Sequence, residues 1–575
     1  MRRLAAPVAL VLLTGCGLPL TEGVRSAGEV PVEQTEPAGI QVLPPGPQPG
    51  ATATELVRGF LRAQSSPDDA HAVARQFLAP DTVWDDTQFA VVYTPGSQTV
   101  RVDPTDPERV EVRLQATARI ASDGSYRLAA EGQQMPAEQF RVQRNRDGEL
   151  ELTDVPAGLR LTTVDVSRSY VPRDVYQLGR PVQADDPVGL VPDRVFLPVT
   201  SDPAAMLVAS LLAGASQPLA PAVETAVPPD TALASPVVVE DGVVTVDLTA
   251  PVRDLAPLDR QRLSAQLVWT LQDFTGVRLL VEGEPLQVSG AGQVQTRDDW
   301  AGYDPAGALD NAALYYVQGR KLQSLDGALA AGAATRPGPL QVDEAAVNPI
   351  SRSLAVLTGA PGVDEIRIGS LRGTMGEPVF SRPDLASMSW GSGERGLWVL
   401  ERGEQPRVWV LSADGSPEQE VLIERPDGAG PLSRVVVSRD GARVALVFGL
   451  DDARELFVGR VQPAGSGMRV ADVVPVAPAF RDVTDVSWES GTSLVVLAAD
   501  SSAAGLLALR VSVDGSINAP LQRQGVEGVP ISVAAAPGQE LVVAAAQPGL
   551  PSRLFRDNGV LFRPQVQGSA PFYPG

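Results

Sequence analysis

Hydrophobic and polar residues alternate with two different periods along the chain, and each change of period marks a change of element. Apolar residues at helical spacing predict two helices within residues 56–77. Over residues 109–120, apolar and polar side chains alternate strictly, which predicts one long strand with a single buried face. Asp-Gly pairs at 123–124 and 147–148 predict hairpin turns after it. The pattern indicates an α+β module over residues 51–180.

The next module, predicted over residues 190–290, has clear helix signals. Asp202 followed by Pro203 is typical of a helix N-terminus, and Gly214 is expected to end the helix that they open. A longer second helix has one apolar stripe and is expected to stop at Gly276. The stripe consists of Leu263, Leu267, Leu271 and Phe274. Short strands before, between and after the helices make this a second α+β module.

Residues 310–575 are rich in short strands and repeat themselves. A small residue beside a buried strand recurs at steps of 41, 49, 49 and 47 residues, at Asn348, Ser389, Ser438, Ser487 and Ala534. A period of about 40–50 residues built from short strands is typical of a β-propeller, here of five or six blades. Segments 314–317 and 554–557 resemble each other, which suggests one blade closed by both ends of the domain. The alternative is a pair of β-sandwiches with accidental spacing. The fold class is multi-domain α+β followed by all-β.

The N-terminus has a third pattern. Arg2 and Arg3 precede an apolar run over residues 4–13 that is too short to span a bilayer. The run ends in Leu13, Thr14, Gly15 and Cys16. A basic start, a short apolar run and small residues before a break are typical of an export signal, here residues 1–15. Residues 16–50 are rich in proline and lack periodicity, which predicts an extended tether after the signal.

Composition narrows the functions that are open to this chain. The formal net charge of −22 disfavours binding to nucleic acid and to anionic lipid headgroups. Cys16 is the only cysteine, so structural disulfides are excluded and zinc has no ligand cluster. We therefore expect no metal, no cofactor and no nucleic-acid partner.

Residues that catalysis commonly needs are scarce. The only histidine, His71, is expected on the polar flank of a helix as a solvated surface residue. The only lysine, Lys321, has Gln318 where an S-x-x-K motif would have its serine. Adjacent acidic residues point to opposite faces of a strand, so the acidic pairs are expected to be turn residues. They lie at 68–69, 85–86, 185–186, 298–299 and 451–452. Calcium binding at the last pair is the alternative, and no catalytic residue is predicted.

Three segments resemble known families. Two helices followed by an antiparallel sheet resemble the cone-shaped folds typified by nuclear transport factor 2. The sequences VVVEDGVVTVDLT and LSAQLVWTL, with residues 211–214, resemble the GerMN domain of spore-germination proteins and envelope lipoproteins. Residues 13–16 resemble the lipobox of bacterial lipoproteins. That resemblance implies that Cys16 carries an S-diacylglyceryl group and, after cleavage, an N-acyl chain such as palmitate, which together give stable anchoring.

The full order of lipobox, tether, helix-plus-sheet module, GerMN domain and propeller resembles the LpqB lipoproteins of actinobacteria. The resemblance implies a protein on the extracytoplasmic face of the cell membrane, bound to membrane lipid through the acylated Cys16. It also implies an accessory role in two-component regulation. LpqB proteins associate with the extracellular region of a sensor histidine kinase of the MtrB type, and the family bears on envelope homeostasis and cell division.

Two functions from different classes remain open at this point. The first is a non-catalytic regulator that binds the kinase ectodomain. The alternative is a cell-wall polysaccharide-binding protein, or a weak glycoside hydrolase that uses propeller carboxylates. Two carboxylates about 5–10 Å apart in one cleft would favour the hydrolase.

Overall fold

The computed structural model describes residues 44–575, except 131–134, 181–187, 307–311, 326–339, 372, 374, 392–395, 413–418, 466, 501–505 and 522–523. The chain divides into two units, Met1–Pro44 and Pro45–Gly575. Every element below belongs to the second unit. The predicted signal, the lipobox and most of the tether lie outside the described residues.

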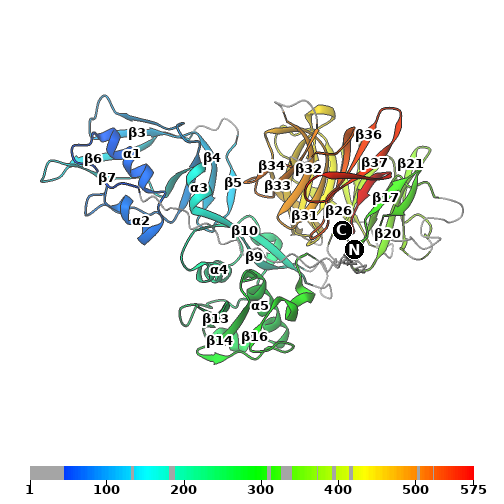
Figure 1. The fold of residues 1–575 in the computed structure, drawn as a ribbon, viewed down its shortest axis with the longest axis horizontal. Helices are drawn as coiled ribbons and strands as arrows, with labels where there is room; N and C mark the ends of the chain where they lie inside the picture. The colour runs from blue at the N-terminus through cyan, green and yellow to red at the C-terminus, as the bar shows by residue number, and fades with distance from the viewer. Residues whose placement is uncertain are drawn as a thin grey trace, which may run out of the picture. The chain divides into compact units, whose positions relative to one another are not determined.

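The first module packs helices against two four-stranded sheets (Figure 1). Helix α1 (Ala53–Ala63) begins at Thr52, whose side chain accepts the backbone N–H of Glu55 while the Glu55 carboxylate accepts the N–H of Thr52. This capping box satisfies two otherwise unpaired donors. The strand orders are β5-β4-β1-β8 and β2-β3-β6-β7. The other elements are α2 (Asp68–Arg75), β1 (Phe89–Tyr93), β2 (Thr99–Val102), β3 (Arg109–Arg113), β4 (Ala116–Ala121), β5 (Tyr126–Leu128), β6 (Glu138–Arg144), β7 (Leu150–Asp154), β8 (Leu159–Thr162) and α3 (Thr163–Ser169). The α+β character that the sequence predicts is confirmed.

The long strand predicted over residues 109–120 is two strands. β3 pairs with β2 and β6, whereas β4 pairs with β1 and β5, so the chain changes sheets after Arg113. The apolar face of both strands is buried in the same core. The alternation of apolar and polar residues therefore predicted the buried face correctly. It could not predict which neighbouring strands pair with this segment by hydrogen bonds. The two predicted Asp-Gly turns join β4 to β5 and β6 to β7.

The second module is built around a long hairpin and a β-α-β unit. Strands β9 (Tyr170–Gly179) and β10 (Leu190–Pro198) pair antiparallel over nine residues. Strands β13 (Val243–Leu248) and β14 (Gly276–Val281) run parallel, with helix α5 (Pro257–Thr270) connecting them. A parallel pair requires such a crossover connection. The other elements are α4 (Pro203–Leu212), η1 (Ala220–Ala222), β11 (Val223–Glu224), β12 (Val238–Glu240), η2 (Ala250–Asp254), β15 (Glu284–Pro285), β16 (Val294–Gln295) and η3 (Arg297–Tyr303).

The two predicted helices of this module are present, and the second is shorter than expected. Asp202 caps α4 by accepting the N–H of Ala205 at 3.0 Å, and Pro203 occupies the first turn. Helix α5 ends at Thr270 rather than near Gly276. The stripe is nevertheless buried over its first three residues, and Phe274 lies half-buried in the turn that follows. The hydroxyl of Thr270 accepts the N–H of Tyr176 from β9, so contacts with that strand fix this end of the helix.

The third module is a β-propeller of six blades (Figure 1, green to red). The first five blades each run outward through four consecutive strands, starting with the inner strands β19, β23, β27, β31 and β35. Outer strands β26 and β30 also pair with each other, which joins the second and third blades into one sheet. The bounds are β19 (Glu344–Val347), β20 (Ser353–Ala360), β21 (Val363–Ser370), β22 (Phe380–Arg382), β23 (Leu385–Trp390), β24 (Leu397–Glu401), β25 (Arg407–Leu411), β26 (Gln419–Ile423), β27 (Leu432–Val437), β28 (Arg443–Phe448), η4 (Asp451–Ala453), β29 (Glu455–Ala464), β30 (Gly467–Pro475), β31 (Phe480–Ser490), β32 (Ser493–Asp500), β33 (Leu506–Ser512), β34 (Asn518–Pro520), β35 (Val529–Ala534), β36 (Val542–Gln547), β37 (Leu550–Asp557) and β38 (Phe562–Gln567).

The sixth blade contains strands from both ends of the domain, as the sequence suggests. Its inner strand is β39 (Ser569–Phe572), followed by β17 (Tyr315–Gln318) and β18 (Lys321–Ser324). The C-terminal segment expected in this blade, 554–557, lies instead in β37 of the fifth blade. Its likeness to segment 314–317 reflects the repeat of strands from blade to blade, which does not distinguish a closing strand from any other.

The buried stripe of α5 gives a direct test of the second module. Leu267 is fully buried, whereas Leu258 on the same helix is 50% exposed. Truncating a buried leucine to alanine typically costs about 2–5 kcal/mol. We expect Leu267→Ala to lower the free energy of opening of α5, measured by hydrogen exchange, by that amount. Leu258→Ala is the matched control and should change it by less than about 0.5 kcal/mol. Equal effects of the two substitutions would show that the packing of α5 is wrongly assigned.

Candidate functional site

The predicted lipid-attachment residues lie outside the described residues. Cys16 and the preceding Leu13, Thr14 and Gly15 all fall within Met1–Pro44. Their roles therefore remain predictions from the sequence.

His71 is not the solvated surface residue that the sequence suggests. It is partly buried, its ring lies edge-on to Trp84 at 5.9 Å between centroids, and its Nδ1 atom is buried without a partner among the described residues. Burial lowers the pKa of His71, and the nearby Asp86 carboxylate partly offsets this. Helical spacing identified the apolar stripe of α2 but could not show that Trp84, after the helix, covers its flank.

Two of the acidic pairs have partners in the structure, at 85–86 and 298–299. Asp85 accepts hydrogen bonds from Thr87 and Gln88, and Asp86 forms an ion pair with Arg75 at 2.8 Å. Asp299 completes a capping box at the start of η3. No group of three or more His, Cys, Asp or Glu side chains suited to a metal ion occurs within the described residues. The pair at 185–186 lies outside them.

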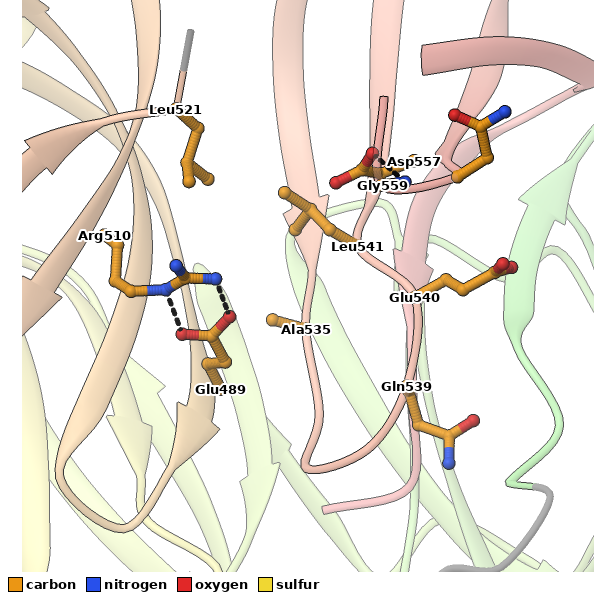
Figure 2. Close-up of a pocket in the computed structure, with 10 residues that line it drawn as sticks. Glu489, Arg510, Leu521, Ala535, Gln539, Glu540, Leu541, Asp557 and Gly559 are labelled. Atoms are coloured by element: carbon orange, nitrogen blue, oxygen red, sulfur yellow. Dashed lines mark hydrogen bonds and ion pairs between the residues drawn. The ribbon is translucent and has the colours of Figure 1, made fainter. Parts of the chain in front are cut away.

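A cleft between the fourth and fifth blades contains several carboxylates and bears on the hydrolase alternative (Figure 2). Both oxygens of Glu489 accept hydrogen bonds from Arg510 at 2.6 Å. Asp557 accepts the backbone N–H of Gly559 at 2.9 Å. Figure 2 shows the carboxylate of Glu540 turned away from Glu489, and Glu540 pairs with Arg556 at 3.2 Å. Each carboxylate of this cleft therefore has a structural partner, and they do not converge on one point where a glycosidic bond could lie.

The centre of the propeller holds a more regular arrangement, in which serines on one inner strand bond to the backbone of the next. The hydroxyl of Ser387 donates to the carbonyl of Val435 and accepts its N–H. Ser487 does the same with Ala535, at 3.2 and 3.0 Å. Ser389 accepts the N–H of Val437. The repeated small residues at 389 and 487 thus join neighbouring blades.

Carboxylates play the same part on other inner strands. Glu344 accepts the N–H of Met388 at 2.8 Å, and Asp485 accepts the N–H of Val533 at 2.8 Å. Asp485 also pairs with Arg434 at 2.7 Å. Burial raises the pKa of Asp485, and Arg434 and the backbone donors act against that rise. Both acids are therefore positioned as structural acceptors.

These bonds surround a central channel with a cavity of about 220 Å³. Both the Ser387–Ser389 pair and the Asp485–Ser487 pair bond to residues that advance in the same direction on the next strand, so neighbouring inner strands run parallel. We call the end of the channel where the inner strands begin the entry end, and the other the exit end. Sequence reasoning missed the channel because its polar residues come from different blades and lie far apart in the chain, from Glu344 to Ser487. The signal that could have revealed it was the pair of Ser-Trp sequences at 389–390 and 487–488. Their indoles donate to Ala346 and Val436 of the preceding blades.

Comparison with known proteins decides the family. Family models match residues 46–167 (Lipoprotein LpqB, N-terminal domain), 174–287 (Sporulation and spore germination) and 312–574 (Lipoprotein LpqB beta-propeller domain). A lipoprotein LpqB of Thermobifida fusca is 31% identical over 100% of this chain and 99% of its own length. The chain belongs to the LpqB lipoprotein family.

Another member of the LpqB family, from Mycobacterium tuberculosis, is 27% identical over 98% of this chain and 97% of its own length. Among solved structures, TolB from Acinetobacter baumannii matches with a TM-score of 0.35 and 12% identity, over 59% of this chain and 88% of TolB. The relatives are named as lipoproteins, without a catalytic name. Membership of the LpqB family indicates a membrane-anchored protein. Within residues 44–575, gaps excepted, no helix is long and apolar enough to span a bilayer.

The single histidine of the chain allows a clean test of the site around Trp84. Because burial lowers the pKa of His71, its neutral form is favoured in the folded state. The contribution of neutral His71 to the free energy of unfolding is then complete above the ordinary pKa of 6.5. It is lost as the pH falls from 6.5 toward the lower pKa of His71 in the folded state. In tag-free protein, the histidine ring proton signal should titrate with a midpoint below 6.5 when folded and near 6.5 in denaturant. Identical midpoints would contradict the burial of His71.

Proposed function

We propose that this protein is a non-catalytic accessory lipoprotein that binds the extracytoplasmic region of a sensor histidine kinase of the MtrB type. Lipid on Cys16 holds it at the membrane, and the proline-rich sequence that follows is the proposed tether. Through the kinase it affects envelope homeostasis and cell division. The observation that carries the proposal is the end-to-end relationship to the LpqB lipoproteins.

The propeller supports binding better than chemistry. Ser387, Ser487 and Asp485 of its channel hold blades together, and the carboxylates of the blade 4–blade 5 cleft are paired. Loops at the two ends of a rigid propeller are suited to contact a partner because they can vary without disturbing the sheets. In the described parts of the first two modules, the sheets do not form such a ring around one axis.

The fifth blade offers a specific surface at the entry end. Val529 begins β35 and is 57% exposed, and Leu550 begins β37 and is 64% exposed. Val529 pairs with Ala546 near the end of β36, so both exposed side chains lie at the same end of the blade. Exposed apolar side chains that lie together are typical of a protein interface. We assign the kinase contact to this end of the propeller.

Co-purification of the kinase from membranes tests the proposal. Deleting residues 311–575 while keeping the anchor should abolish capture of the kinase. Val529→Ser combined with Leu550→Ser should weaken it by more than about tenfold, since each buried aliphatic side chain contributes about 1.5–3 kcal/mol.

The same blade supplies a matched control. Val560 and Leu561 are also exposed, but they lie in the turn between β37 and β38 at the exit end. Val560→Ser combined with Leu561→Ser should leave kinase capture unchanged. Full capture by the deletion variant would move the interface to the first two modules. Absence of kinase from the wild-type sample would contradict the proposed function.

A further inference from the structure

A second pocket of the propeller lies between the second and third blades, where their shared core ends. Its volume is about 330 Å³. It is at the exit end, because its lining includes the turns that follow inner strands β23 and β27. Most of the lining belongs to these two blades, and Arg180 and Ala222 of the second module complete it. Pockets of this size between packed units are common places for small ligands.

Trp398 of β24 lines this pocket and is unlike every other tryptophan of the chain. It packs in the core between the two blades and is 3% exposed. The chain has seven tryptophans, and Trp398 is the one whose indole N–H donates no hydrogen bond within the described residues. The others donate to a carbonyl or a side-chain oxygen, and they are Trp84, Trp269, Trp300, Trp390, Trp409 and Trp488. A buried indole N–H normally has an acceptor, so this one is left for a ligand.

Gln462 of β29 supplies a second unused donor from the facing blade. It lines the same pocket and is 9% exposed. Its Oε1 atom accepts a hydrogen bond from Nη2 of Arg469 at 3.0 Å. Because arginine can only donate, this contact fixes which end of the amide is oxygen. The Nε2 atom then remains, and it donates to no group in the described part of the chain.

Both nitrogens are accessible. Neither the indole nitrogen of Trp398 nor Nε2 of Gln462 is among the enclosed polar atoms without a partner in the described chain. Each residue lines the pocket, so a molecule bound there can accept from one donor on each blade.

The charged side chains of the lining are already paired. Asp440 accepts hydrogen bonds from the hydroxyl of Ser438 and the N–H of Ala442. Arg180 forms an ion pair with Glu224 at 3.4 Å. The pocket therefore favours a neutral ligand over an ion.

The remaining walls and the size of the pocket narrow the ligand further. Apolar side chains lie beside the two donors, from Val410, Val461 and Met468. The volume corresponds to about eleven water molecules, or a ligand of about a dozen non-hydrogen atoms. A sugar ring has this size, with oxygens around its edge and C–H groups on its faces. Its hydroxyls can accept from both donors and turn their own hydrogens toward solvent, whereas each peptide carbonyl comes with an amide N–H that needs an acceptor.

We propose that the exit-end pocket between the second and third blades binds one ring of a neutral saccharide. Nε1 of Trp398 and Nε2 of Gln462 donate to its oxygens, and the apolar walls contact its C–H face. The pocket lies at the opposite end of the propeller from the surface assigned to the kinase, and its occupancy does not depend on that assignment.

Ligand-observed NMR with the full-length protein in detergent tests the proposal with four probes. They are glucose, N-acetylglucosamine, glucuronate, and alanine blocked at both ends by acetyl and methylamide groups. We expect saturation transfer to N-acetylglucosamine, to glucose or to both. Blocked alanine bound as tightly as the sugars would overturn the assignment to a saccharide. Glucuronate bound as tightly as glucose would overturn the assignment to a neutral ligand.

Two substitutions remove the donors singly. Trp398→Phe keeps an aromatic ring in the core without the N–H, and Gln462→Met keeps the length of the side chain without the amide. We expect each to weaken sugar binding about fivefold or more. Trp409→Phe is the matched control, because Trp409 lies on the next strand, donates to Glu401 and does not line the pocket. An equal loss of binding in this control would contradict a local role for Trp398.

A third variant keeps the proposal testable if Trp398→Phe fails to fold. A Cβ atom on Gly391 would lie 3.5 Å from the indole nitrogen of Trp398, at ordinary contact distance. Gly391→Ala should therefore cover the N–H while leaving the tryptophan in place, and should weaken sugar binding. Undiminished binding in this variant would overturn the proposal, as would failure of the wild-type protein to bind either neutral sugar.

Discussion

The propeller depends on the pairing of two strands from opposite ends of its sequence. Tyr315 of β17 lies opposite Phe572 of β39, and their rings stack with 5.5 Å between the ring centroids. The hydroxyl of Ser569 donates to the carbonyl of Val317, which is 252 residues away. Joining segments so far apart costs conformational entropy, although that cost rises only slowly with loop length. Once the pair forms, each inner strand has a neighbour on both sides, and the channel acquires a complete wall.

The inner ring supports the proposed binding role over a catalytic one. Ser387, Asp485 and Ser487 would look like reactive groups in a list of channel residues, yet each holds the backbone of the next blade. Their oxygens are already engaged in holding the blades together.

The sequence predicted what depends on periodicity and turn chemistry. The two α+β modules, the Asp-Gly turns, the cap at Asp202 and the propeller could be read from spacing alone. Contacts between segments that are distant in the sequence could not be predicted in this way. The change of sheet after Arg113 is set by hydrogen-bond partners, the cover over His71 comes from Trp84 beyond its helix, and the closing strand is one of many similar strands. The inter-blade serines were visible as a repeat, but the bonds that they make needed the structure.

Hydrogen exchange of a chain shortened before Ser569 tests the central claim that closure holds the propeller together. We expect the amides of β17, β19 and β35 to lose most of their protection, because each would border an open gap or belong to a ring without its closing strand. Peptides from α5 should keep wild-type protection, since that helix belongs to a separate core. Wild-type protection of β19 and β35 in the shortened chain would contradict the account.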